Sequence, residues 1–355
     1  MGQDVLSALI GTATGVVLAI VSSLIIPLVI RRQEKRDQRR SIHEKYAQPL
    51  AADAVNLLWR LDEILFRGRS QYLRDEAPAT AFNVYKRIST CYRLAVLLGW
   101  VRAIELEQSY LFFGEGASVE DLRTAVIDLK SALADSPHVE THVLRGLAGL
   151  WKLELPEDPG AVARAAASGN AEMQHVLADF GLINHRDLPT LEDAKQVQVV
   201  QRMSRSITSA LGLPSLDDAA VRATCPEAIA RMSVKQAWIY RDWQQAIGTL
   251  MIRPIDDAAR RFDVIDYGTF ERLFARADGE ERPWMERLEA VVVGIDVATA
   301  DPADFRVSQL RAVARALAAL VCAIERLDLE RRILDPKACQ LARKLRATIP
   351  PRDAG

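Results

Sequence analysis

The sequence predicts an all-α protein, with an N-terminal transmembrane helix followed by a multi-helix cytoplasmic domain. Three observations predict this class. Residues 5–30 carry no charge, apolar residues recur with the 3.6-residue period of a helix through the rest of the chain, and no stretch alternates as a half-buried strand does. The 355 residues balance 46 basic against 47 acidic side chains. This balance excludes a polybasic nucleic-acid binder, so we expect no nucleic-acid partner.

The uncharged run from Val5 to Ile30 is 26 residues long, which is enough to cross a bilayer. A helix rises about 1.5 Å per residue, so about 20 residues span a hydrocarbon core of about 30 Å. A cleaved signal peptide is the main alternative. Its apolar region is shorter and follows a basic residue, whereas residues 1–4 carry only the acidic Asp4. We therefore expect residues 1–4 to form a short external N-terminus.

Basic residues follow the apolar run directly and predict its orientation. Seven of them lie within residues 31–45, and none precedes the run. The positive-inside rule then places the N-terminus outside and the C-terminal domain in the cytoplasm, with the chain in the plasma (inner) membrane. Only nine of the 46 basic residues are Lys, a bias typical of GC-rich bacterial genomes. Six of the seven residues are candidates for lipid-headgroup contact: Arg31, Arg32, Lys35, Arg36, Arg39 and Arg40.

Small residues recur every four positions along the apolar run and therefore fall on one helix face. Small side chains let two helix backbones approach closely in lipid, where no hydrophobic force drives pairing. The pattern predicts a homo-oligomer that associates through the span, although small residues are also common in membrane helices that do not pair. The helix-association residues are Ser7, Gly11, Gly15, Ala19 and Ser23.

The cytoplasmic part reads as a succession of helices. Residues 31–66 form a basic juxtamembrane segment and an amphipathic helix, which Pro49 would interrupt or bend. Residues 67–155 form a helical subdomain. Its helices are expected at about residues 79–113, after a capping box at Ser118 and after Pro137.

A cluster of Pro and Gly at residues 156–160 is the clearest break in the chain. Residues 160–349 form a second helical subdomain, either separate from the first or continuous with it. Within it, we expect a helix capped by Thr190 and Asp193 and ending at Gly212, and a long helix from Pro226 to about residue 252. Later helices are expected near residues 267–277, 283–296, 303–334 and 336–348.

Residues 165–187 resemble a single ankyrin repeat, with Gly169, Asn170 and Gly181 at consensus positions. One repeat cannot bury its own apolar face, and no second copy follows at a 33-residue offset. Two helices joined by glycine turns are the favoured interpretation of this segment.

Two longer stretches resemble a known group of proteins. One is Arg40-Ser-Ile-His-Glu-Lys-Tyr46-Ala-Gln-Pro49-Leu with residues 59–65 after it, and the other is residues 240–248 with residues 264–270. Together they are similar to an uncharacterised family of bacterial single-pass membrane proteins with a helical cytoplasmic domain. The resemblance implies this architecture and no activity, so no catalytic residue is carried over.

No motif nominates a catalytic, cofactor-binding or metal-ligating residue. His138 and His142 lie on one helix face, but the segment lacks the His-Glu-x-x-His order of a metalloprotease. Gly114 and Gly116 follow a helix rather than a strand and lack the rest of a phosphate loop. The four cysteines are far apart, which fits small buried apolar groups in a reducing compartment.

An aromatic cluster after residue 237 is the strongest candidate for a docking site. Tyr240 and Trp243 fall on the apolar stripe of the expected helix and are predicted core residues. Trp238 and Arg241 fall on the adjacent face, where this pair of residue types is typical of interface anchors. Stacking of Arg241 on Trp238 is the alternative.

These features favour a membrane-tethered helical adaptor or sensor that presents a cytoplasmic protein-interaction surface and self-associates through its span. Its partners would be membrane lipid, a second copy of the chain and an unknown cytoplasmic protein. We expect no cofactor and lean away from an enzyme. The alternative is a membrane-linked effector or enzyme, for example in stress or defence, with a site that the sequence does not reveal. A channel subunit is a third hypothesis, for which the span offers only Ser and Thr as polar groups.

Overall fold

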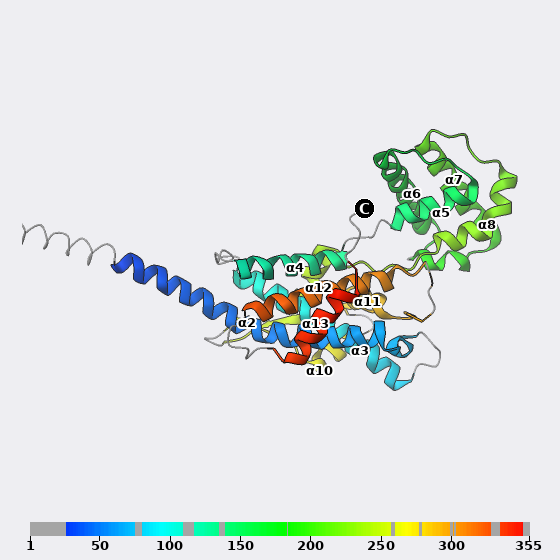
Figure 1. The fold of residues 1–355 in the computed structure, drawn as a ribbon. Helices are drawn as coiled ribbons and strands as arrows, with labels where there is room; N and C mark the ends of the chain where they lie inside the picture. The colour runs from blue at the N-terminus through cyan, green and yellow to red at the C-terminus, as the bar shows by residue number, and fades with distance from the viewer. Residues whose placement is uncertain are drawn as a thin grey trace, which may run out of the picture.

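The protein is a helical bundle with a smaller helical domain at one end and a projecting helix at the other (Figure 1). The computed structural model describes residues 26–74, 80–108, 117–134, 139–182, 184–256, 260–276, 279–298, 301, 303–327 and 334–350. Residues 5–25 of the expected transmembrane helix lie outside these ranges. The all-α class is confirmed for the described residues, apart from one short hairpin.

The bundle combines the first and last thirds of the described chain. Its first part contains α2 (Ile26–Phe66), the 3-10 turn η2 (Arg69–Leu73), α3 (Ala81–Gln108) and α4 (Ala117–Ala134). Its second part contains α9 (Arg241–Met251), α10 (Tyr267–Ala275), α11 (Arg282–Val292), α12 (Phe305–Leu327) and α13 (Pro336–Thr348). Between α9 and α10, the strands β1 (Ile252–Pro254) and β2 (Phe262–Val264) pair antiparallel, with Ile252 opposite Val264.

Helix α12 lies at the centre of the bundle and packs against α2, α4 and α13. Its apolar stripe, which includes Leu310, Leu317 and Leu320, is buried. Among the described residues, one segment is long and apolar enough to cross a membrane, Phe305–Arg326, and 67% of its most apolar window is buried inside the protein. A helix that is apolar on most of its surface fits the centre of a large core, which explains this composition.

The small domain is an insertion between α4 and α9, and it has a hydrophobic core of its own. It contains α5 (Val139–Trp151), α6 (Pro159–Asp179), the 3-10 turn η3 (His185–Thr190), α7 (Asp193–Leu211) and α8 (Asp218–Met232). Of the Pro- and Gly-rich residues 156–160, residues 156–158 lie between α5 and α6, and Pro159 and Gly160 begin α6. The buried residues Trp151 of α5 and Val162 of α6 belong to the same cluster. This stretch therefore connects two helices that share one hydrophobic core.

The structure corrects two expectations that rest on proline. Helix α2 is not interrupted at Pro49: it continues to Phe66, and the buried side chains of Tyr46 and Leu50 pack into the core on either side of the proline. Pro226 does not begin a helix, because it lies inside α8, which starts eight residues earlier at Asp218. The Asp217 side chain caps α8 by accepting a hydrogen bond from the amide of Ala220.

The ankyrin interpretation of residues 165–187 is also wrong, as is the two-helix alternative. Helix α6 runs unbroken through Gly169, which lies buried against Ile207 and Met203 of α7. Because Gly169 has no side chain, α6 and α7 can approach closely at this position. The chain turns only later, at Gly181, which has φ 67°. Thr190 does not cap α7, since its hydroxyl donates to the carbonyl of Asp187 within η3. The predicted end at Gly212 is confirmed, with φ 69°.

All four cysteines are free and buried, as the sequence predicts. Burial raises the pKa of Cys91, Cys225 and Cys339, the last to about 11. These thiols therefore stay protonated at neutral pH and behave as small apolar groups.

Candidate functional site

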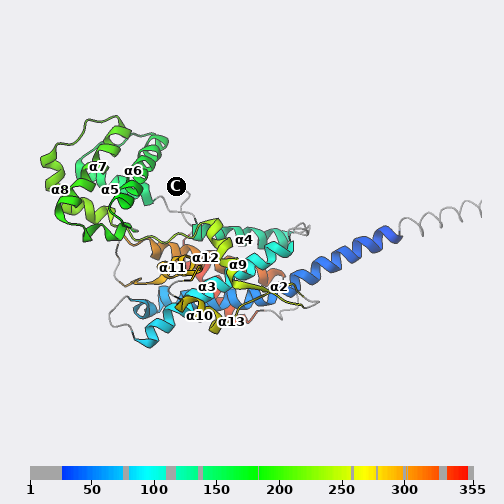
Figure 2. The ribbon, with the colours of Figure 1, turned by 180° about the vertical axis from the view of Figure 1, so that it is seen from behind.

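The residues that the sequence predicts to act at the membrane lie either outside the described residues or in the first half of α2. Ser7, Gly11, Gly15, Ala19 and Ser23 lie outside the described residues. The six basic residues from Arg31 to Arg40 lie in the N-terminal half of α2, which leads away from the bundle (Figures 1 and 2). Figure 2 shows from behind that no other helix accompanies this half of α2.

The predicted docking pair Trp238 and Arg241 does not lie on a helix face. Trp238 is 8% exposed and donates its Nε1 hydrogen to Oε1 of Gln236 at 2.9 Å. Arg241 begins α9 and donates to the hydroxyl of Ser131 at 3.1 Å. The expectation for Tyr240 is reversed, because this predicted core residue is 51% exposed.

These corrections have one cause, which is that residues 233–240 are not helical. This crossing segment carries the chain from the small domain back to the bundle. Its backbone is bonded to distant segments: Lys235 donates to the carbonyl of Ala303 at 2.8 Å, and Ile239 donates to that of Leu133 at 2.9 Å. Such bonds satisfy the backbone groups that a helix would have used.

The side chains of two buried glutamines also donate hydrogen bonds to the crossing segment. Nε2 of Gln309 donates to the carbonyls of Leu133 and Ala237, at 3.1 and 3.0 Å. Nε2 of Gln244 donates to the carbonyls of Lys130 and Ile239, both at 2.8 Å. The segment is thereby held on the C-terminal end of α4 and belongs to the bundle rather than to the small domain.

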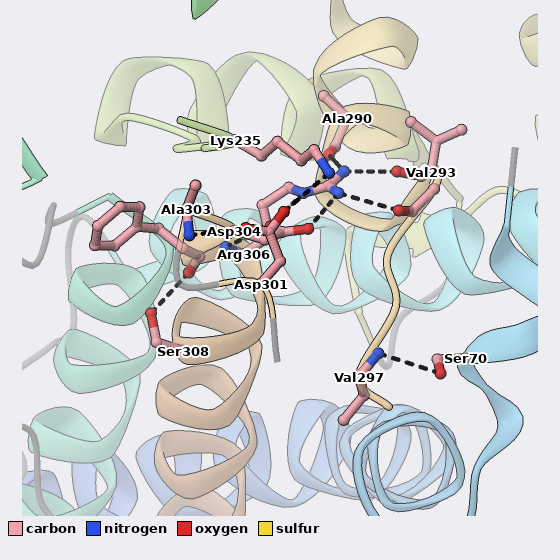
Figure 3. Close-up of polar contacts among 12 residues, drawn as sticks. Ser70, Lys235, Ala290, Val293, Val297, Asp301, Ala303, Asp304, Arg306 and Ser308 are labelled. Carbon is pink, nitrogen blue, oxygen red and sulfur yellow. Dashed lines mark hydrogen bonds and ion pairs between the residues drawn. The ribbon is translucent and has the colours of Figure 1, made fainter. Parts of the chain in front are cut away.

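An ion pair lies beneath the junction of the crossing segment with α12 (Figure 3). Arg306 and Asp304 have side chains that are only 3% and 4% exposed, and their closest atoms are 2.7 Å apart. The guanidinium of Arg306 also donates to three backbone carbonyls at the end of α11, those of Ala290, Val293 and Gly294. The backbone of Asp304 pairs with that of Lys235 in an isolated parallel β-bridge. The ion pair therefore connects α11, α12 and the crossing segment.

A cavity of about 110 Å³ lies between the small domain and the crossing segment. Its walls come from α5, α6, η3 and α7 on one side and from residues 236–240 on the other. The apolar lining includes Val143, Met173, Met203, Trp238 and Tyr240, and the polar lining is Glu140, Asn170, Gln174, His185 and Gln236. A cavity at a domain junction, lined by both apolar and polar side chains, is a common setting of a ligand site.

Two of the polar side chains that line this cavity, which we call the junction cavity, make no hydrogen bond within the described part of the chain. Nε2 of His185 is buried without a hydrogen bond, and burial lowers the pKa of this imidazole. His185 is therefore neutral at pH 7. Leaving such an atom unpaired costs about 1–3 kcal/mol. Among the described residues, no hydrogen bond or ion pair links Glu140 to a partner, although this carboxylate lines the same cavity.

A second cavity of about 250 Å³ opens between α2, α3 and α10, and aromatic rings surround it. Tyr85, Tyr92 and Tyr267 line it, and both Tyr85 and Tyr92 contact Tyr267 edge to face. The series of ring contacts continues over the surface from Tyr85 to Phe82 and Tyr72. Burial and a hydrogen bond to Glu271 raise the pKa of Tyr267 to about 12, so its hydroxyl stays protonated.

Neither cavity could be found by searching for motifs, because each draws on residues that are distant in the sequence. The one local signal was the aromatic cluster at Trp238 and Tyr240, which does line the junction cavity. His142, half of the predicted histidine pair, packs edge to face on Phe305, and His138 lies outside the described residues. Within the described ranges, no three His, Cys, Asp or Glu side chains are grouped as metal ligands.

Comparison of the chain with protein-family models, with curated proteins and with solved structures finds no match. The resemblance to a family of bacterial single-pass membrane proteins therefore stays a prediction.

Proposed function

We propose that the protein is a membrane-tethered helical adaptor or sensor, with its N-terminus outside the inner membrane and its helical domain in the cytoplasm. The tether is supported by the continuity of α2. This helix starts at Ile26, within the uncharged run, passes the six basic residues and enters the bundle without a break. One helix would thus connect the membrane to the folded domain.

The orientation gives the first testable prediction. A reporter fused after Gly355 should be active only if it works in the cytoplasm, because seven basic residues follow residues 5–30 and none precedes them. Neutral replacements of Arg31, Arg32, Lys35 and Arg36 should weaken this bias. Activity of a C-terminal alkaline phosphatase in the parent chain would contradict the proposed topology.

The second part of the proposed tether is that the chain self-associates through its membrane span. Ser7, Gly11, Gly15, Ala19 and Ser23 would let two copies of the span pack closely. Two or more cytoplasmic domains would then be held at one membrane site, which raises their effective concentration toward a partner.

One observation carries the adaptor part of the proposal, namely a group of contacting aromatic rings that we call the aromatic surface: Tyr72, Phe82, Tyr85 and Tyr267. Tyr72 and Tyr267 are half-buried. Phe82 and Tyr85 are 50% and 46% exposed. The ammonium of Lys86 lies 5.3 Å from the centroid of the Phe82 ring and 6.0 Å from that of Tyr85. Aromatic rings are enriched in the buried centres of protein interfaces, so this surface suits a cytoplasmic protein partner.

Site-specific photocrosslinking in cells tests the adaptor proposal. A benzophenone amino acid at position 82 or 85 should give a discrete crosslinked product that contains a second, different protein. The same probe at Ile127 is the matched control, because this residue is also a large exposed apolar side chain, 45% exposed, but lies on α4. Absence of a product at positions 82 and 85, or an equal product at position 127, would contradict an adaptor role for this surface.

A further inference from the structure

The junction cavity is lined by the types of residue that are typical of a ligand-binding site. Its walls belong to two bodies, the small domain and the crossing segment that is fastened to the bundle. Its lining combines apolar side chains with amides, one imidazole and one carboxylate, which suits a small ligand that has both a polar and an apolar part.

The charge of the lining indicates the sign of the ligand. Among the described residues that line the cavity, Glu140 is the one acidic side chain, and the rest of the polar lining is amides and the neutral imidazole of His185. The described lining includes no Lys or Arg to balance this carboxylate. An anion would be repelled there, whereas a cation would complete an ion pair in partly desolvated surroundings.

The aromatic and sulfur-containing lining fits an organic cation better than a metal ion. Trp238 and Tyr240 contribute two aromatic rings, whose faces attract ammonium groups. Trp238 and Glu140 both line the cavity. Met173 and Met203 supply soft apolar surface for an alkyl body.

The size of the cavity sets the scale of the ligand. A cavity of roughly 150 Å³ holds benzene, so one of about 110 Å³ holds a compact group of only a few heavy atoms.

We propose that the junction cavity binds a small organic ammonium ion, held by the Glu140 carboxylate and the rings of Trp238 and Tyr240. The ion contacts the small domain and the bundle together, so its binding fixes the two bodies relative to one another. This inference does not depend on the aromatic surface or on the identity of a protein partner.

Calorimetric titration of the full chain in dodecyl maltoside micelles tests the inference. Phosphate buffer is used, because neither maltoside nor phosphate contains an ammonium group that would compete. The probes are n-butylammonium and n-propylammonium, and their uncharged counterparts of similar shape are 1-butanol and 1-propanol. We expect at least one cation to bind with a Kd below about 1 mM, and at least tenfold more tightly than its alcohol.

Two variants separate the proposed site from general charge effects. Glu140→Gln keeps the shape of the side chain, and it should weaken binding of the cation at least tenfold. Glu154→Gln removes the same charge from an exposed position in the same domain, outside the cavity, and should bind like the parent. The thermal unfolding curve of each variant verifies that it is folded.

Three results would overturn the inference. Neither cation binds the parent chain, each alcohol binds as tightly as its cation, or Glu140→Gln binds as tightly as Glu154→Gln. None of these results bears on the crosslinking test, so failure here is distinguishable from failure of the adaptor proposal.

Discussion

Replacing Arg306 by Ala should lower the free energy of unfolding by about 3–5 kcal/mol, because it leaves the carboxylate of Asp304 buried and unpaired. The loss extends beyond the ion pair. Two nitrogens of Arg306 donate to the carbonyls of Ala290, Val293 and Gly294, and these acceptors would also lose their partner (Figure 3). Urea unfolding of the full chain in maltoside micelles, followed by helical circular dichroism, gives the free energy.

Arg343→Ala is the matched control for this prediction. Arg343 also pairs with a carboxylate, that of Glu325, but the two side chains are 63% and 35% exposed. Exposed pairs contribute about 0.2–1 kcal/mol, so the control should unfold almost like the parent. Equal effects of the two substitutions would show that the Arg306 ion pair does not hold α11, α12 and the crossing segment together.

The helices that the sequence predicted well are those with local end signals. Helix α13 has the predicted bounds, Pro336–Thr348, because Pro336 occupies the first turn and Asp335 caps the amide of Lys337. The end of α7 at Gly212 follows equally from one residue that adopts a left-handed conformation. These signals lie within a few residues of the feature that they determine.

The crossing segment could not be predicted from its own residues. Its hydrogen-bond partners Leu133 and Ala303 lie about 100 and 70 residues away, and its apolar residues Val234 and Trp238 are spaced like those of a helix. Tertiary contacts therefore overrode the helical conformation that the sequence pattern predicted for this segment. The same reason accounts for the reversed environments of Trp238 and Tyr240.

The junction cavity was missed because no short motif contains it. Glu140, His185 and Trp238 come from α5, η3 and the crossing segment, and the fold alone brings them together. The small domain was also hidden, because its residues are as apolar and as helical as those of the bundle. The small domain is distinguished from the bundle by its buried residues, which contact one another in a cluster of their own.

Gly248→Ala should destabilise the protein by about 1–3 kcal/mol, because the crossing of α3 and α9 leaves no room for a methyl group. A Cβ at position 248 would lie 2.7 Å from the carbonyl oxygen of Leu98 and 2.7 Å from Cβ of Arg102. The carbonyl belongs to the backbone of α3, so it cannot move aside as a flexible side chain would. The two helices would have to separate and lose contacts along their buried faces.

Gly149→Ala is the control with the opposite expected sign. Gly149 lies on the exposed face of α5, and a Cβ there would have no atom within 4 Å. Alanine in a helix is favoured over glycine by about 0.5–1 kcal/mol, so this change should stabilise the protein slightly. The same urea titration measures both variants. If Gly248→Ala is neutral or stabilising like Gly149→Ala, α3 and α9 do not approach as closely as the positions of Leu98 and Arg102 require.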